Sequence, residues 1–313
     1  MSYSVEELLA GLKAAGEETR LRVLALFESS ELTVTELVTI LRQSQPRVSR
    51  HLKLLCEAGL LERHREGTWI FYRLAEAGTP GGDLARAIMA FIPLQDQLLQ
   101  HDQERLQEVK RERNEKAAEY FRLNAENWDK IRSLYVPERD VEKLLLELTA
   151  GMKIDTLLDV GTGTGRMLEI FAPHIGKGIG IDLSREMLSV ARVNLEKAGV
   201  NNCQVRQGDM YDLALPDRSV DLVLFHQVLH FADEPLSALK ETSRLLKKGG
   251  GVIIVDFSPH DLEFLREEHA HRRLGFADEE ISAWCRQVGL ICDPVIRLKG
   301  RELEVSIWMA HKK

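Results

Sequence analysis

Residues 157–165 read Leu-Leu-Asp-Val-Gly-Thr-Gly-Thr-Gly, and this stretch decides the fold of the second half of the chain. The apolar residues before Gly161 predict a buried strand, and the three alternate glycines predict a tight turn into a helix. A Cβ at these glycines would obstruct the turn and keep a ligand away from the main chain. Further along, residues 179–182 (Ile-Gly-Ile-Asp) predict a second strand that ends on Asp182, a carboxylate able to accept two hydrogen bonds from a ribose diol.

The spacing of these glycines separates two classes of nucleotide-binding protein. Dinucleotide-binding enzymes carry Gly-x-Gly-x-x-Gly, whereas this chain has Gly-x-Gly-x-Gly, with Asp159 two residues before the first glycine. The pattern resembles the first motif of class I S-adenosylmethionine-dependent methyltransferases. A strand–turn–helix unit that binds no ligand is the alternative interpretation of the same residues.

The resemblance to these methyltransferases covers about residues 115–313. It continues through QVRQGDMYDLAL (204–215), VDLVLFHQVLHF (220–231), KKGGGVIIVDF (247–257) and LEVSIWMAHK (303–312). It implies an α/β fold for this half: a Rossmann-like, doubly wound domain with a mostly parallel seven-stranded sheet whose last strand is antiparallel.

The resemblance also implies a ligand, S-adenosylmethionine or S-adenosylhomocysteine, at the carboxyl ends of the strands. Asp209 would hold the adenine amino group, and the main chain of Met210 would hold a ring nitrogen. The cofactor-binding residues that we expect are Asp159, Gly161, Thr162, Gly163, Gly165, Asp182, Leu183, Met187, Asp209, Met210 and His226.

His226 follows the fourth strand of this domain, where it would face the sulfonium, and it is our candidate catalytic base. The segment 118–131 resembles the lid helix of small-molecule methyltransferases. The residues that we expect around the acceptor are Tyr120, Phe121, Trp128, His230 and His260.

Metal and arsenic chemistry are not expected. His226 and His230, like His269 and His271, are closely spaced, but neither pair has a third ligand at metal spacing. Arsenic methyltransferases need several positioned cysteines. The cysteines of this region, Cys203, Cys285 and Cys292, show no such grouping in the sequence.

The first half of the chain carries a second motif, between Glu31 and Leu74. Leucine and valine at helical spacing predict two short amphipathic helices joined by a turn, and alternation after residue 60 predicts a β-hairpin. Between Glu36 and Glu57 there is no acid, although the chain as a whole has a net charge of −7. The basic and amide side chains of the second helix are the types that identify bases in the major groove.

This region resembles the winged-helix repressors of the ArsR type across residues 5–76, through SQPRVSRHLKLLCEAGLL (44–61) and REGTWIFYRL (65–74). The resemblance implies binding to double-stranded operator DNA, with a winged helix used only for assembly as the alternative. The residues that we expect to contact DNA are Gln45, Arg47, Ser49, Arg50, His51, Lys53, Arg63 and Arg65.

One departure from the ArsR pattern bears on regulation. Metal-sensing members carry Cys-Val-Cys where this chain has Thr33-Val34-Thr35. A hydroxyl is a poor ligand for a soft metal beside a thiolate. Cys56 lies alone on the apolar side of the recognition helix and is expected in the core. A signal other than a metal should therefore control this protein.

Length and composition set the remaining expectations. The 313 residues suggest three segments: a winged helix at 1–82, a helical dimerisation and linker segment at 83–117, and a methyltransferase-like domain at 118–313. We expect a homodimer formed through the first helix and the helix beginning near Asp83. Four widely spaced cysteines with no Cys-x-x-Cys pair, the absence of a signal-peptide pattern and the absence of a long apolar run indicate a cytoplasmic protein with no membrane contact.

Three functional hypotheses follow from these motifs. The methyltransferase-like domain binds an adenosyl ligand as the effector of a transcriptional regulator, or it methylates a small acceptor while the winged helix controls its own operon. In a third hypothesis, the winged helix only mediates assembly of the protein and does not bind DNA. Binding and turnover need the same motifs, so the sequence leaves the first two hypotheses, and with them the question of enzymatic activity, open.

Overall fold

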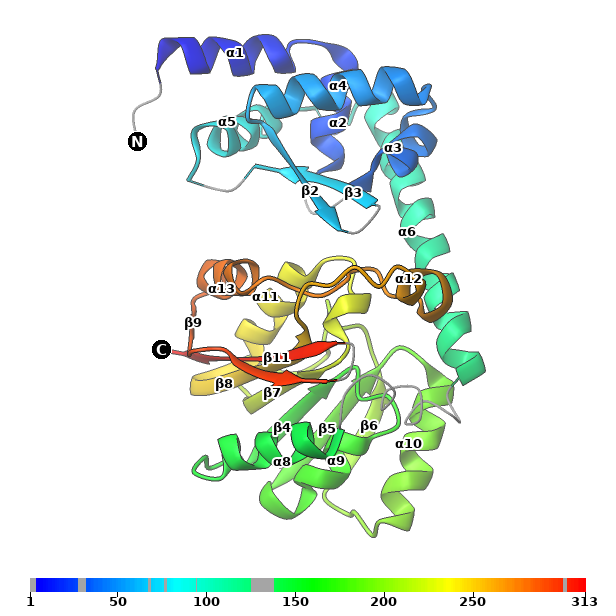
Figure 1. Ribbon diagram of the computed structural model, residues 1–313, viewed down its shortest axis with the longest axis vertical. Coiled ribbons are helices and arrows are strands. Elements are labelled where there is room, and N and C mark those ends of the chain that lie inside the picture. The colour runs from blue at the N-terminus through cyan, green and yellow to red at the C-terminus, as the bar shows by residue number, and fades with distance from the viewer. Residues whose placement is uncertain are drawn as a thin grey trace. The chain divides into compact units, whose positions relative to one another are not determined.

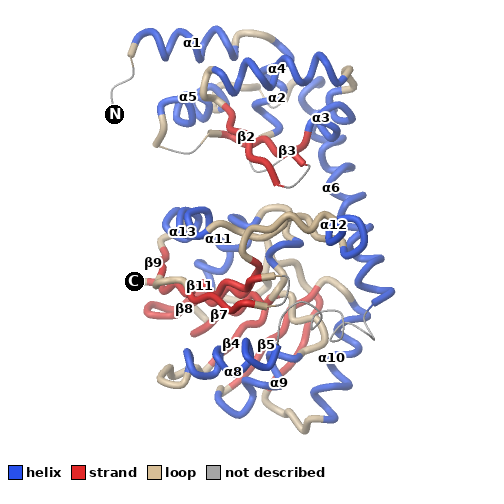
Figure 2. Tube along the Cα trace, in the orientation of Figure 1, coloured by secondary structure: helices blue, strands red, loops and turns tan. Residues whose placement is uncertain are grey.

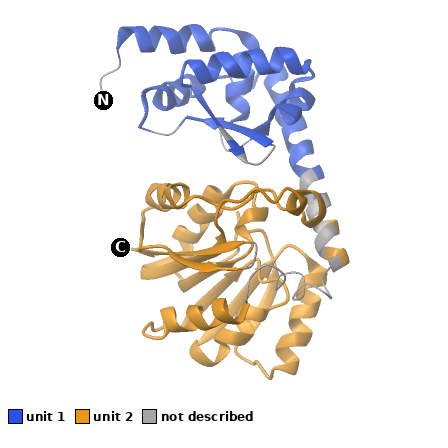
Figure 3. Ribbon diagram, in the orientation of Figure 1, with its two compact units in different colours: residues 1–115 blue, residues 116–313 orange. Residues whose placement is uncertain are grey.

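The computed structural model describes residues 4–27, 32–66, 69–75, 78–93, 95–124, 138–300 and 303–313. The chain divides into two compact units, residues 1–115 and 116–313 (Figure 3). The helix that spans the division, α6 (Gln97–Asn124), is continuous across it.

The first unit combines helices with a small antiparallel sheet in the order β1-β3-β2 (Figure 1). Helices α3 and α4 form a helix-turn-helix, and the β2–β3 hairpin forms the wing that follows it. The elements before α6 are α1 (Val5–Ala15), α2 (Glu18–Leu26), β1 (Leu32–Thr33), α3 (Val34–Leu41), α4 (Gln45–Glu57), β2 (Leu61–Glu66), β3 (Trp69–Leu74) and α5 (Pro80–Met89).

Local sequence signals fix the limits of these helices. Thr33 caps α3 through a reciprocal pair of contacts with Glu36, and Arg42 ends that helix in a left-handed conformation with φ of 53°. Pro46 lies in the first turn of α4, where a missing N–H leaves no helical hydrogen bond unmade. The helix that we expected to begin near Asp83 begins earlier: Thr79 caps α5, and Asp83 accepts a hydrogen bond from the N–H of Gly78.

A buried ion pair attaches α6 to the helix-turn-helix. Arg22 of α2 donates to both carboxylate oxygens of Asp102, at 2.6 and 2.8 Å, and the Asp102 side chain is only 1% exposed. Arg105, one turn further along α6, also contacts Asp102 and donates to the carbonyl of Ile40 in α3. Residues 83–115 of the expected linker segment therefore lie in this unit, where Ala85 and Leu106 join the core.

The second unit is an α/β domain built on an eight-stranded sheet (Figure 2). Its helices are α8 (Glu138–Thr149), α9 (Arg166–Phe171), α10 (Arg185–Lys197), α11 (Pro235–Leu245), α12 (Phe264–His269) and α13 (Asp278–Gln287), with short 3-10 helices η2 (Ala172–His174) and η3 (Leu229–Phe231). Its strands are β4 (Thr156–Val160), β5 (Lys177–Asp182), β6 (Cys203–Gln207), β7 (Val220–His226), β8 (Leu246–Phe257), β9 (Leu290–Cys292), β10 (Ile296–Lys299) and β11 (Glu304–Lys312).

The sheet order is β10-β11-β8-β7-β4-β5-β6, with β9 also paired to β11. Strands β6, β5, β4, β7 and β8 run parallel, and β11 is antiparallel to β8, which confirms the expected mixed sheet. The seven strands of this path match the expected count, and the short β9 adds an eighth. Strand order reverses between β4 and β7, and open α/β sheets bind ligands beyond such a point.

Two hydrophobic clusters cover the two faces of this sheet. Neighbouring residues of one strand alternate between them, as Leu157 and Leu158 do in β4. Helices α11 and α13 pack on the first face, and α8 and α9 pack on the second. The glycine loop after β4, Asp182 and the histidines after β7 and β8 lie at the carboxyl edge of the sheet, between these two layers of helices.

Candidate functional site

The glycine loop after β4 is held by left-handed backbone and by hydrogen bonds to β5. Gly161, Gly163 and Gly165 have φ angles of 70°, 52° and 81°, a region that L side chains avoid. The N–H groups of Gly161 and Thr162 both donate to the carbonyl of Ile181, at 2.7 and 2.9 Å. A Cβ at Gly161 would also overlap the side chain of Val228. The loop thus needs glycine both for its conformation and for its close packing.

Asp182, at the end of β5, lies beside this loop. Its two carboxylate oxygens accept the N–H groups of Gly163 and Ser184, at 2.8 and 2.9 Å. Burial raises the pKa of Asp182, and the backbone hydrogen bonds partly oppose that rise. After Asp182, Leu183 is 56% exposed, whereas Met187 in α10 is buried in the fold. The carboxylate is therefore fixed at the mouth of the glycine loop.

Two further acids occupy different environments around the loop. Asp159 in β4 is 1% exposed, and the Thr162 hydroxyl donates to it at 2.6 Å. This buried carboxylate therefore holds the glycine loop from its buried side. Asp209 is exposed and accepts the N–H of Tyr211 at 3.0 Å. Strand β6 ends at Gln207, so Asp209 and half-buried Met210 lie in the following loop.

The carboxyl end of β7 carries His226 and a residue that sequence analysis did not select, Gln227. His226 is 6% exposed, with its Nε2 3.7 Å from a carboxylate oxygen of Glu138 in α8. Gln227 is equally buried and has a φ of 52°. Its side-chain nitrogen has no hydrogen-bond partner among the described residues. Strained polar residues of this kind concentrate at functional sites, but backbone strain leaves no mark in a single sequence.

His230 and His260 come together with His271 beyond the ends of β7 and β8. His230 stacks on His271 with ring centroids 4.1 Å apart, and both His230 and His260 contact the ring of Phe257. The structure does not test the other three residues expected around the acceptor. Tyr120 and Phe121 belong to α6, but their side chains, like the whole of Trp128, lie outside the described residues.

This arrangement fits an adenosyl ligand. The glycine loop exposes main chain without Cβ atoms, and the carboxylate of Asp182 is fixed directly beside it. The N–H of Gly208 donates to the Asp182 carbonyl, which brings the loop after β6 to the same edge. Asp182 would hold the ribose, and the segment 208–210 would border the base. Within the described residues, no group of three His, Cys, Asp or Glu side chains is placed to hold a metal ion.

The outer face of α4 presents most of the residues expected to contact DNA. Gln45, Arg47, Arg50 and Lys53 are exposed, as are Arg63 and Arg65 of β2, while Ser49 is half-buried. His51 differs, because its Nδ1 lies 3.5 Å from a carboxylate oxygen of Glu17 at the start of α2. Burial lowers the pKa of His51. This histidine is thus turned towards the protein.

Replacing Arg47 or Arg50 by alanine is expected to weaken specific operator binding by about 1–3 kcal/mol if that arginine contacts a base. If the side chain contacts only phosphate, specific and non-specific affinity should fall together and the salt dependence should flatten. Titration of operator and scrambled duplexes at several salt concentrations separates the two effects. Arg192→Ala, a change to an arginine exposed on α10, is the control. Unchanged binding in an Arg47/Arg50 double variant would favour the assembly-only hypothesis.

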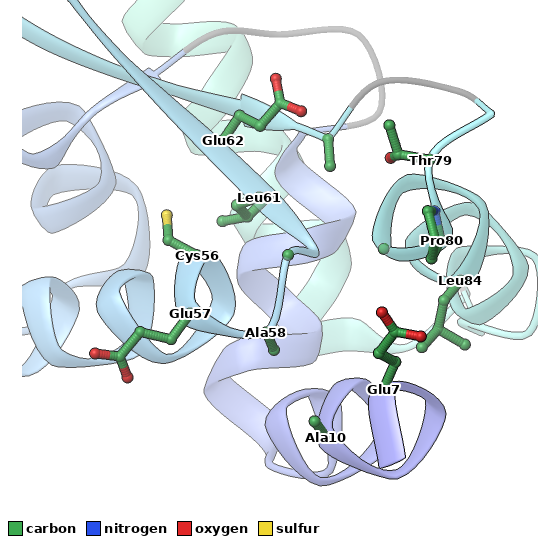
Figure 4. Close-up of a pocket in the computed structure, with 13 residues that line it drawn as sticks. Glu7, Ala10, Cys56, Glu57, Ala58, Leu61, Glu62, Thr79, Pro80 and Leu84 are labelled. Atoms are coloured by element: carbon green, nitrogen blue, oxygen red, sulfur yellow. The ribbon is translucent and has the colours of Figure 1, made fainter. Parts of the chain in front are cut away.

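Two cysteine environments emerge only from the structure. Cys56 packs against the core as expected, and it also borders a cavity of about 480 Å³ between α1, α4, β2 and α5, which Glu7 and Glu62 line (Figure 4).

Cys285 of α13 and Cys292 of β9 share a hydrogen bond that lowers the pKa of Cys292 to about 7. The turn between α13 and β9 brings this pair together, which the spacing of the cysteines along the chain does not indicate.

Comparison with known proteins finds one family model within each unit. A family model described as "Bacterial regulatory protein, arsR family" matches residues 17–63, and one described as "Methyltransferase domain" matches residues 158–255. The chain joins an ArsR-family helix-turn-helix domain to a methyltransferase domain. Among the described residues of this ArsR–methyltransferase chain, no helix has the length and apolarity needed to span a bilayer.

Individual relatives resemble one domain at a time. The arsenical resistance operon repressor of Escherichia coli is 53% identical over 64 residues, which are 20% of this chain and 55% of that protein. The uncharacterized methyltransferase YcgJ of Bacillus subtilis is 33% identical over 106 residues, 34% of this chain and 42% of YcgJ. An arsenite methyltransferase of Halobacterium salinarum is 35% identical over 105 residues, 33% of this chain and 27% of that enzyme.

These matches each span less than two thirds of the relative's own length. The crystal structure of YcgJ aligns with a TM-score of 0.50 at 19% identity, over 56% of this chain and 99% of that one. At this identity the likeness shows the methyltransferase fold alone.

Proposed function

We propose that this protein is a DNA-binding transcriptional regulator whose methyltransferase domain binds S-adenosylmethionine or S-adenosylhomocysteine as its effector. The observation that carries the proposal is the continuity of α6, which is anchored to the helix-turn-helix and extends into the methyltransferase unit. The absence of the thiolate pair at Thr33-Val34-Thr35 supports it, because a regulator without its metal ligands needs another signal.

The contacts of α6 provide the route for coupling. Asp102 binds Arg22 of α2, and Arg105 donates to the last turn of α3, immediately before the recognition helix. The guanidinium of Arg22 also reaches the carbonyl of Leu41 at 3.4 Å. A shift of α6 on ligand binding would therefore act on the elements that orient α4. Such coupling requires that the ligand binds the free and DNA-bound states with different affinities.

A second function is favoured by the histidines beyond β7 and β8. Their buried nitrogens suit an active methyltransferase for a small acceptor, with the winged helix controlling its own operon. Arsenite remains a disfavoured acceptor despite the arsenite methyltransferase relative. Cys203 lies on β6 at one edge of the sheet, whereas the Cys285–Cys292 pair lies at the β9 side of the opposite edge.

Calorimetry with each adenosyl ligand, on the free protein and on its operator complex, tests the regulator proposal. Coupling of about 1–3 kcal/mol would change the ligand dissociation constant by roughly 5-fold to 150-fold between the two states. Equal dissociation constants, together with methyl transfer to an added acceptor, would favour the enzymatic function instead.

The regulator is also proposed to be a homodimer. Helix α1 exposes Val5, Leu8, Leu9 and Leu12, which are between 38% and 74% exposed, and such a row of apolar side chains marks an association surface. Two-fold symmetry would present two recognition helices to adjacent turns of DNA. Light scattering at micromolar concentration should give twice the chain mass, and a double Leu8→Glu, Leu12→Glu variant should give the mass of one chain. A monomeric wild-type protein would contradict this.

A further inference from the structure

The segment between β7 and η3 leads from the glycine loop to His230. Gly161 packs against Val228, and the N–H of Gln227 donates to the carbonyl of Val255 in β8 at 2.8 Å. His230 follows two residues after Val228, and Asp256 is the residue after Val255. His230 and Asp256 therefore lie at the carboxyl edge of the sheet, next to the loop expected to hold the adenosyl ligand.

His230 and Asp256 form a buried dyad with a defined tautomer. The Nδ1 of His230 lies 2.7 Å from Oδ1 of Asp256, and the two residues are 2% and 0% exposed. Asp256 also accepts the backbone N–H groups of His230 and Phe257, at 3.1 and 2.8 Å. A carboxylate that serves three donors requires a proton on Nδ1, which leaves the lone pair on Nε2. That Nε2 is buried and has no hydrogen-bond partner among the described residues.

His260 lies in the same cluster of histidines and supplies a second buried nitrogen, which is a hydrogen-bond donor where Nε2 of His230 is an acceptor. His260 accepts the N–H of Leu262 on its Nδ1 at 3.3 Å, so its neutral ring carries the proton on Nε2. Burial, followed by the electrostatic influence of neighbouring His230, lowers the pKa of His260 to about 4 and keeps the ring neutral at pH 7. Its Nε2 is buried without a partner in the described part of the chain. The cluster thus offers one acceptor and one donor.

The surroundings restrict the chemistry of a ligand here. The rings of Phe231, Phe257 and His271 contact His230, with centroids 4.1 to 5.3 Å away. Arg272, which neighbours the cluster, is paired with Asp233. Rings stacked at 26°, as His230 and His271 are, do not aim their in-plane lone pairs at a common point, as a metal ion would require.

We propose that His230, held by Asp256, is the general base of a methyl-acceptor site for a small uncharged aromatic hydroxyl compound. This inference rests on the proposed adenosyl site and extends its enzymatic alternative. A hydroxyl donates to Nε2 of His230 and accepts from Nε2 of His260, while its ring packs among the aromatic side chains. A carboxylate would supply no donor, and an ammonium group would supply no acceptor.

The proposed transfer is a balanced displacement. The acceptor O–H proton passes to Nε2 of His230, and the imidazolium that forms is stabilised by the Asp256 carboxylate. The acceptor oxygen forms a bond to the methyl carbon as the bond from that carbon to sulfur breaks, with its electron pair left on sulfur. The adenosyl ligand supplies only the sulfonium methyl group. The Nε2–H of His260 donates a hydrogen bond to the acceptor oxygen, and His260 neither gains nor loses a proton.

Phenol and anisole form a matched pair of probes, because anisole lacks only the O–H that His230 would accept. The full chain, labelled with ¹⁵N-histidine and saturated with S-adenosylhomocysteine, is titrated with each and followed by NMR. We expect phenol at millimolar concentration to shift the Nε2 resonance of His230 towards its hydrogen-bonded position. Anisole should leave that resonance in place.

His230→Asn retains a donor towards Asp256 and removes Nε2, so it isolates the proposed base. Its phenol affinity should fall by roughly 2-fold to 10-fold, the value of one neutral hydrogen bond, and its anisole affinity should stay unchanged. His311→Asn, at a side chain 47% exposed on β11, is the control. The same shift with both probes, no shift with phenol, or unchanged phenol affinity in His230→Asn would overturn the proposal. Failure to bind S-adenosylhomocysteine, measured in the same samples, would instead count against the adenosyl site.

Discussion

Replacing Asp102 by alanine is expected to lower the free energy of unfolding of the winged-helix unit by about 3–5 kcal/mol, because it leaves a buried guanidinium without its partner. Arg22 is 7% exposed and donates twice to Asp102, and this bidentate hydrogen bond raises the pKa of Arg22. Hydrogen exchange of peptides from α2 and α4 in increasing urea measures the loss within this unit.

Glu108→Ala is the control for Asp102→Ala, because Glu108 lies on the same helix and pairs with Arg111 at the surface. Exposed pairs of this kind contribute about 0–1 kcal/mol. A double variant, Arg22→Met with Asp102→Leu, should recover part of the stability, since it removes both buried charges. A loss in Asp102→Ala no larger than that in Glu108→Ala would show that the ion pair does not anchor α6.

Changes in the glycine loop are expected to affect the adenosyl ligand without affecting DNA. Gly163→Val places a β-branched residue at a φ of 52° and should abolish binding. Asp182→Ala should weaken binding by about 1–3 kcal/mol through loss of charge-assisted hydrogen bonds to the ribose. Both variants should bind operator normally when no ligand is present. Calorimetry measures the ligand, and a gel shift measures the DNA.

The pH dependence of ligand binding provides an independent check on Asp182. Burial raises the pKa of this carboxyl, so it takes up a proton at a higher pH than an exposed aspartate does. Protonation removes an acceptor, and affinity should therefore fall as the pH is lowered through the raised pKa. Asp182→Asn should lose this dependence. Asp293→Ala, at an exposed carboxylate beside β9, should bind as the wild type does. Unchanged affinity in Asp182→Ala would mean that the pocket is misassigned.

Much of the fold follows from short-range patterns in the sequence. The glycine spacing after Val160 and the apolar periodicity of 37–55 predict a methyltransferase sheet and a helix-turn-helix, because both depend on residues close together in the chain. Strands β9 and β10 escaped prediction because they are only three and four residues long and depend on pairing with β11. The start of α5 was misplaced because Thr79 and Asp83 are both acceptable caps by residue type.

Features that depend on long-range packing had no signal in the sequence. Arg22 and Asp102 are 80 residues apart, and nothing near either one marks a buried pair. His230 was expected in the acceptor pocket, but its contact with Asp256 arises only where β7 and β8 end together. His51 has the residue type and spacing of a DNA contact, yet Glu17 at the start of α2 draws it inwards.

The measurement that tests the regulator account most directly is a titration of operator DNA, taken from the region upstream of the protein's own gene, at fixed salt. It is carried out with S-adenosylmethionine, with S-adenosylhomocysteine and with neither. We expect an adenosyl ligand to move the midpoint by roughly 5-fold to 150-fold, the range of typical allosteric coupling, with S-adenosylhomocysteine the stronger of the two. The Asp182→Ala variant should show a smaller shift at the same ligand concentration. A midpoint that neither ligand moves by even twofold would contradict the sensor account and leave the catalytic function in its place.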